Sequence, residues 1–169
     1  TAAGPRRGGS AATGNYPGKA RNPEELRQDL DKLYTLLPGR HRLSLHMIYG
    51  DFGGRPVERD RMGPEHFSSW LDWGRERGVR LDINGTFFSH PKAAGFTLAS
   101  KDPGIRAYWV EHARRTREVG AHLGRAQGSP CIHNLWIPDG LKDRPADRLG
   151  YRDLLARSLD ETFAAPFPK

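Results

Sequence analysis

The stretch RLSLHMIYG, residues 42–50, decides the fold class of this chain. It is a short apolar run that ends in glycine, a pattern typical of a buried β-strand, and it predicts a strand at about 42–49. The residues before it predict a helix at about 23–37, because leucines recur there at helical spacing and Asn22 can cap the first turn. A helix followed by a buried strand is the repeating unit of an α/β protein.

The same unit recurs twice more along the chain. Apolar runs predict further strands at about 79–88 and 130–137, and helical spacing predicts helices at about 64–77, 102–123 and 151–163. Each crossover is long enough to return the chain in the same direction, so we expect parallel strand pairing. No strand is followed by Gly-x-Gly-x-x-Gly and no Gly-x-x-x-x-Gly-Lys-Ser/Thr motif occurs, which argues against dinucleotide-binding and P-loop folds. We therefore predict an α/β fold that is a partial (β/α)8 TIM barrel.

Composition narrows the classes of function and location. A length of 169 residues suits one domain, and the single cysteine, Cys131, excludes an internal disulfide framework and a multi-cysteine zinc cluster. The net charge of +7 and the pI of about 9.9 invite a nucleic-acid interpretation, but the basic residues are scattered and have acidic neighbours. No apolar run approaches the roughly 20 residues that span a bilayer. We expect a cytoplasmic protein that binds neither nucleic acid nor a membrane.

The two ends of the chain differ from its middle. Residues 1–21 are rich in glycine and alanine at their start and lack hydrophobic periodicity, which predicts a mobile loop. The chain opens on Thr1 without a methionine and closes soon after a helix-like run. From these features we expect a fragment, in which residues 22–169 form an incomplete barrel domain.

The candidate site residues lie where the predicted strands end. In a (β/α)8 barrel the side chains that do chemistry sit at the C-terminal ends of the strands and in the loops that follow. Polar or aromatic residues stand at those positions here: His46, Tyr49, Asn84, Thr86, Phe88, Asn134 and Trp136. A tryptophan suits the C–H face of a sugar and a histidine can hydrogen-bond a sugar oxygen, although both residues are also common in packing. The following residues, 138–143, predict a turn in which Asp139 and Gly140 provide a left-handed position.

The sequence contains no evident metal site or catalytic set. Metal binding needs several convergent ligands, and no His-Glu-x-x-His motif, no Glu-x-Lys strand end and no Asp-x-Asp loop occurs. No Gly-x-Ser-x-Gly motif marks a serine nucleophile. We therefore expect neither metal ligands nor catalytic residues within this chain.

Six segments resemble, in order and over nearly the whole chain, the bacterial L-rhamnose isomerase family. They are ATGNYPGKARN (12–22), LSLHMIY (43–49), PEHFSSWLDW (64–73), FFSHP (87–91), GFTLA (95–99) and NLWIPDGLKD (134–143). The resemblance implies a cytoplasmic, homotetrameric barrel of the xylose-isomerase type that interconverts L-rhamnose and L-rhamnulose with two divalent ions, Mn2+ or a related metal. It also implies a family protein more than twice as long, of which this chain covers the loop after the first barrel strand and the second to fourth strands.

The resemblance also assigns roles to single residues. His46 matches a histidine that lies near the sugar ring oxygen, Trp136 matches a tryptophan that packs against the sugar, and Phe88 falls in a segment that shapes the pocket. Every metal ligand and acid/base residue of the family would lie beyond Lys169. The family has a proline where this chain has Gly85.

Two other functions stay open on the sequence. One is a stand-alone basic α/β module that binds an anionic partner, and the other is a different metal-dependent barrel that acts on a sugar or sugar phosphate. A partial barrel would leave strand edges and an apolar inner face uncovered, whereas a complete module would cover both. On the barrel interpretation, we expect Ile83 and Ile132 to face an inner side that lacks its partners.

Overall fold

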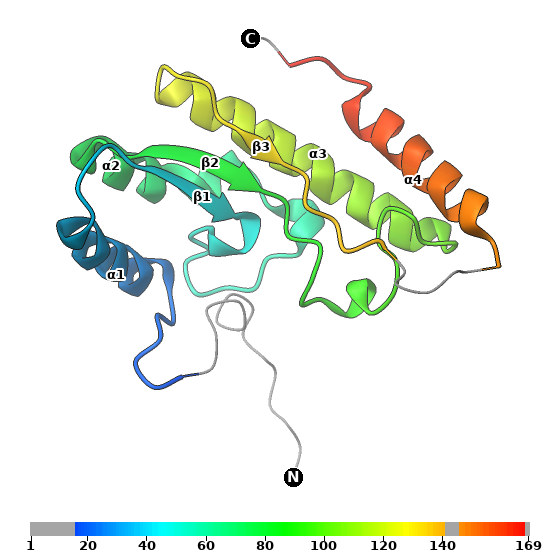
Figure 1. The fold of residues 1–169 in the computed structure, drawn as a ribbon, viewed down its shortest axis with the longest axis horizontal. Helices are drawn as coiled ribbons and strands as arrows, with labels where there is room; N and C mark the ends of the chain where they lie inside the picture. The colour runs from blue at the N-terminus through cyan, green and yellow to red at the C-terminus, as the bar shows by residue number, and fades with distance from the viewer. Residues whose placement is uncertain (1–15, 141–145, 168–169) are drawn as a thin grey trace.

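A computed structural model describes residues 16–140 and 146–167 (Figure 1). Helices and strands alternate along the chain: α1 (Pro23–Leu36), β1 (Arg42–His46), α2 (Ser68–Arg77), β2 (Arg80–Asn84), α3 (Pro103–Ala126), β3 (His133–Asn134) and α4 (Arg148–Phe163). Short 3-10 turns lie between them: η1 (Met47–Tyr49), η2 (Arg59–Arg61), η3 (Pro64–Phe67) and η4 (Pro91–Ala93). This order confirms the predicted α/β class. Most of the loop predicted at 1–21 lies outside the described residues.

The three strands form one parallel sheet in the order β1-β2-β3, as the crossover lengths predict. Each strand is shorter than its apolar run, so the predicted strand ends at 49, 88 and 137 are wrong. β1 ends at His46 because the next three residues wind into η1. β2 ends at Asn84, and shortly after it the Thr86 N–H donates to the ring of His112 rather than to another strand. β3 keeps two residues and pairs, within the described ranges, with β2 alone.

The helices begin where side chains cap their first turns. The Asn22 side chain accepts from a first-turn N–H at 2.8 Å, as predicted, and the Asp102 carboxylate caps α3 in the same way. α3 continues to Ala126, beyond the predicted end at 123, and α4 begins at Arg148, before the predicted start at 151. The helix predicted at 64–77 opens with the 3-10 turn η3 and then becomes α2. None of the described helices is long and apolar enough to cross a bilayer.

Helices α2 and α3 cover one face of the sheet. Leu45, Leu81 and Ile83 point to this face and are buried there with Trp70. A Cβ added to Gly120 of α3 would lie 3.2 Å from Ile83 Cγ2, so the helix and the strand approach closely. The expectation that Ile83 lacks partners is therefore wrong, because Ile83 lies on the helical side of the sheet.

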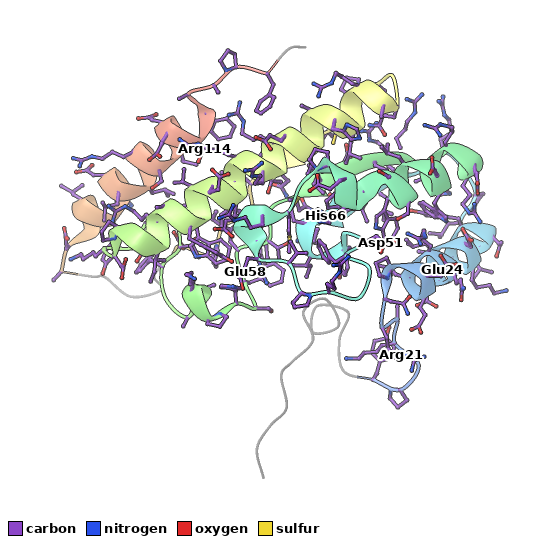
Figure 2. All side chains as sticks on the ribbon, turned by 180° about the vertical axis from the view of Figure 1, so that it is seen from behind. Arg21, Glu24, Asp51, Glu58, His66 and Arg114 are labelled. Carbon is purple, nitrogen blue, oxygen red and sulfur yellow. The ribbon has the colours of Figure 1, made fainter. Side chains whose placement is uncertain are left out.

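The two outer helices pack on the two that cover the sheet. Asp31 of α1 accepts from Trp73 Nε1 of α2 at 2.8 Å. Arg114 of α3 pairs with Glu161 of α4 at 3.1 Å, and Figure 2 shows Arg114 between these two helices. In Figure 1, α1 and α4 accordingly lie at opposite sides of the molecule, with α2, α3 and the sheet between them.

The opposite face of the sheet, which we call the open face, has no helix over it among the described residues (Figure 1). The strand register places on it the alternate residues of β1 and β2 and their neighbours before and in β3: Arg42, Ser44, His46, Asp82, Asn84, Ile132 and Asn134. Ile132 is 61% exposed, as expected for a side chain whose packing partners are missing from the described part of the chain. The described residues thus form an open parallel sheet with a helical layer on one side, rather than a closed barrel.

Candidate functional site

Aromatic rings form a row across the C-terminal ends of the three strands. The ring of His46 lies 6.2 Å from that of Tyr49 and 5.5 Å from that of Phe88, and Phe88 lies 5.2 Å from Trp136. All three contacts are edge to face, the geometry that aromatic quadrupoles favour. The three residues that the sequence singled out for ligand binding, His46, Phe88 and Trp136, are therefore neighbours. Together with Tyr49 they form a group of four rings that we call the aromatic row.

His46 is the polar member of the row. Its Nδ1 lies 3.4 Å from the hydroxyl oxygen of Thr86, and the side chain is half-buried. Burial lowers the pKa of His46, and the positive charge of Arg59 lowers it further. The imidazole is therefore neutral at pH 7, so one ring nitrogen can donate a hydrogen bond while the other accepts.

Trp136 projects from a segment that alternates between the core and the solvent. Leu135 and Ile137 pack against the core cluster around Phe87 and Trp109. Trp136, between them, points the other way and is 53% exposed. A large ring that is held at one edge by Phe88 and open elsewhere offers a flat apolar surface to a ligand.

Asp139 anchors the chain just after Trp136. One of its carboxylate oxygens accepts from Thr97 N at 2.7 Å and Thr97 Oγ1 at 2.8 Å, and the other accepts from Ala99 N at 2.6 Å. The segment is thus tied to a buried loop rather than turned by a left-handed residue. The predicted left-handed position is wrong for Gly140, whose φ is not positive and whose N–H donates to Pro138 O at 2.7 Å.

The loop after β2, which carries Phe88, is bonded to a buried histidine of α3. His112 of α3 accepts from Thr86 N at Nε2 and donates from Nδ1 to Arg59 O, both at 3.0 Å. These two bonds fix a neutral tautomer, and burial lowers the pKa of His112 to about 3. The ring also stands edge to face with Phe87 at 5.1 Å, so it packs as well as bonds.

Gly85 opens this loop. A Cβ at residue 85 would lie 2.5 Å from Cε2 of Phe87, so this chain uses the free space to seat the Phe87 ring. Phe87 is fully buried and Phe88 is half-buried, which matches the predicted alternation of these two rings across the strand end.

The supporting residues Arg59, His112 and Asp139 were missed by sequence reasoning. His112 did carry a signal, because it falls at helical spacing among the buried residues of α3, Trp109, Thr116 and Val119. A histidine in such a stripe has to satisfy both ring nitrogens inside the core. Arg59 lies in a polar loop and Asp139 in a turn-like motif, so neither had a local signal.

The described residues do not fit the metal that the resemblance implies. No group of three or more His, Cys, Asp or Glu side chains that could hold an ion lies within residues 16–140 and 146–167. Asp82, the carboxylate on the open face, is already bound by Arg42 Nε at 2.8 Å and by Ile132 N at 2.6 Å. Asn84 Oδ1 is buried without a partner, but a single amide oxygen is not a metal centre.

Comparison with known proteins places the chain in a family. The family model for L-rhamnose isomerase (RhaA) matches residues 2–169. An L-rhamnose isomerase of Bacteroides thetaiotaomicron is 54% identical over 165 residues, and one of Rhodopirellula baltica is 55% identical over 161 residues. These alignments cover 98% and 95% of this chain but 40% and 38% of the relatives, so the chain spans about two-fifths of their length. The chain belongs to the L-rhamnose isomerase family.

Proposed function

We propose that this chain forms one wall of the sugar site in an L-rhamnose isomerase, which interconverts L-rhamnose and L-rhamnulose as an aldose and a ketose. The observation that carries the proposal is the aromatic row, which joins His46, Phe88 and Trp136 at the C-terminal ends of parallel strands. Those ends are where α/β barrels place their active sites. The family of the chain supports a sugar as the ligand.

Each residue of the row has a role that its chemistry suits. Trp136 packs its exposed ring on the C–H face of the sugar, and Phe88 sets the position of that ring through their edge-to-face contact. His46, neutral at pH 7, hydrogen-bonds the ring oxygen or a hydroxyl and can pass a proton when the ring opens. The residues that carry out the isomerisation itself are proposed to lie outside the described residues.

We also propose that the isomerisation step depends on parts of the longer protein. The described residues contain no metal site, so the two divalent ions of the resemblance, Mn2+ or a related metal, would be held elsewhere. The closed (β/α)8 barrel, the homotetramer and the cytoplasmic location belong to the same proposal. The open face and the outer edge of β3, which pairs with no other strand in the described part of the chain, are consistent with further strands.

The alternative of a stand-alone basic module gains no support from the described surface. Many of its basic side chains are paired with carboxylates, among them Arg27, Arg42, Arg75, Arg77, Arg114 and Arg115. Such pairing leaves less free positive charge for an anionic partner.

A chimeric enzyme tests the proposed function. In it, this chain replaces the 165 matched residues of the Bacteroides thetaiotaomicron relative, so that the remaining length is present. We expect the chimera, with Mn2+ added, to convert L-rhamnose to L-rhamnulose, and the isolated chain to show no turnover. A chimera that folds and binds Mn2+ but leaves L-rhamnose unchanged would contradict the proposal.

Trp136→Ala in the chimera tests the wall itself. We expect KM for L-rhamnose to rise about tenfold with a smaller change in kcat, because stacking holds the sugar before and during the reaction alike. Trp136→Phe should recover part of the loss. Phe163→Ala is the matched control, since Phe163 is 49% exposed but lies on α4, and it should leave KM unchanged. An equal effect of both alanine variants would remove Trp136 from the site.

A further inference from the structure

Arg59 is a buried cation that forms no ion pair with a carboxylate among the described residues, although the charge of nearby Glu58 stabilises it. It lies in η2, between β1 and α2, and is 7% exposed. No carboxylate oxygen among the described residues is within 4.0 Å of its guanidinium nitrogens, and its charge is met by the carbonyl oxygens of Thr86 and Ser89. Burying a charge in this way is costly, and its retention calls for a use of the charge or of the forked geometry.

The main chain of Arg59 is fixed as firmly as its side chain. Its N–H donates to Tyr108 Oη at 3.2 Å, and its carbonyl accepts from His112 Nδ1 at 3.0 Å. Tyr108 Oη in turn donates to Glu58 Oε2 at 2.8 Å, and Figure 2 shows Glu58 on the loop beside α3. The main chain of Arg59 is therefore bonded to two residues of α3, Tyr108 and His112, and this fixes the point from which the guanidinium extends.

The two carbonyls that Arg59 bonds bracket the two phenylalanines. Phe87 points into the core, 5.3 Å from Trp109, and Phe88 points to His46 and Trp136. Ser89 has a φ of 54°, a left-handed conformation that residues other than glycine rarely adopt. The bond from Arg59 to Ser89 O, at 3.0 Å, holds this strained turn closed. A side chain with one donor group could not bridge both carbonyls in the same manner.

The charge of Arg59 also reaches His46. The groups around His46 are the rings of Tyr49 and Phe88 and the hydroxyl of Thr86, none of which is charged at pH 7. Asp82 lies on the same face but is paired with Arg42. Arg59 is therefore the charged group that acts on His46 among the described residues, and it lowers the pKa of His46 in addition to burial.

We propose that Arg59 is a positioning residue of the sugar site, which holds the loop after β2 so that Phe88 contacts His46 and Trp136. This inference rests on the proposed function of the aromatic row. Arg59 touches neither the open face nor a ligand directly; it acts through Phe88 and His46. It therefore has two separable effects, one from its geometry and one from its charge.

Two substitutions in the chimera separate these effects. Arg59→Lys keeps the charge but presents its donors from a single nitrogen, so it cannot reproduce the two-nitrogen fork that reaches the carbonyls of Thr86 and Ser89. We therefore expect KM for L-rhamnose to rise several-fold while the acid limb of kcat/KM stays in place. Arg59→Gln also removes the charge, so KM should rise about tenfold and the acid limb should move to higher pH as the pKa of His46 returns toward its ordinary value. His46→Asn should abolish that limb, which identifies it.

Arg117→Gln is the matched control. Arg117 also donates to two backbone carbonyls, those of Thr162 and Ala165, but it does so at the C-terminal end of α4. We expect its loss to leave KM and the acid limb unchanged. If Arg59→Gln does not accumulate as folded enzyme, the KM of Arg59→Lys decides whether Arg59 positions the loop.

The outcomes distinguish this inference from the function on which it rests. If both Arg59 variants change only the melting temperature and match Arg117→Gln in KM and pH profile, Arg59 is merely structural and the inference fails. If His46→Asn and Trp136→Ala also leave the kinetics unchanged, the proposed sugar site itself fails. If His46→Asn and Trp136→Ala lose activity while the Arg59 variants do not, the proposed sugar site stands and the role of Arg59 is rejected.

Discussion

Asp139→Ala is expected to lower the free energy of unfolding by about 3–5 kcal/mol, because it removes three hydrogen bonds to a charged acceptor at once. Thr97 and Ala99, which donate these bonds, are buried, so water cannot replace the lost carboxylate. The segment that carries Trp136 would also come loose from its anchor. The effect is measured as the loss of thermal or denaturant stability of the chimera, together with the KM for L-rhamnose.

Two companion variants make the result specific. Asp139→Asn keeps one oxygen for Thr97 but turns a donor toward Ala99 N, so an intermediate loss is expected. Asp72→Ala removes an exposed carboxylate that pairs with Arg75 at 3.0 Å, and it should change stability by less than about 0.5 kcal/mol. A small loss for Asp139→Ala, equal to that for Asp72→Ala, would show that the anchor does not hold the segment.

His112→Leu is expected to cost about 3–5 kcal/mol, because it leaves the Thr86 N–H and the Arg59 carbonyl buried without partners. Leucine has a similar size, so the loss reflects hydrogen bonds more than packing. His122→Leu, on the same helix, makes a suitable control, since no hydrogen bond of the His122 side chain is formed among the described residues. We expect the control to unfold close to the parent.

The lowered pKa of His112 also predicts how the stability of the folded chain depends on pH. The pKa of His112 is about 3 in the folded chain and near 6.5 in an unfolded one, so between these values only the unfolded chain binds the proton. Stability must therefore fall as the pH drops below about 6.5, by up to about 1.4 kcal/mol per pH unit from this residue. His112→Leu lacks this contribution, so the difference between parent and variant should shrink toward pH 4. A difference that stays constant with pH would contradict the buried neutral tautomer.

Three of the site residues could be predicted from sequence because strand ends converge in a parallel sheet. His46, Phe88 and Trp136 each stand at or just beyond the end of an apolar run, and parallel pairing brings those ends to one edge. The exact strand ends did not follow from the runs. Whether an apolar residue continues a strand or enters a turn, as at Met47, depends on the hydrogen bonds that its backbone finds elsewhere.

The support of the site could not be predicted in the same way. The Arg59 side chain donates to the backbone of Thr86, 27 residues away, and the Arg59 carbonyl accepts from the His112 ring, 53 residues away. Asp139 accepts from Thr97 at a separation of 42 residues. No local pattern encodes such pairs, because each residue only satisfies its partner after the sheet and α3 have assembled. Ile83 shows the same limit, since its apolar character did not say which face of the sheet would bury it.

The sequence by itself determined the α/β alternation, the parallel direction of the strands, the helix cap at Asn22 and the family resemblance. These features depend on residues near one another in the chain, where periodicity and capping chemistry act directly. Only the tertiary structure decided which residues support the aromatic row: the buried cation Arg59, the neutral His112, and Asp139, whose carboxylate accepts three hydrogen bonds. Those choices depend on burial, which turns distant backbone groups into the partners that these side chains must have.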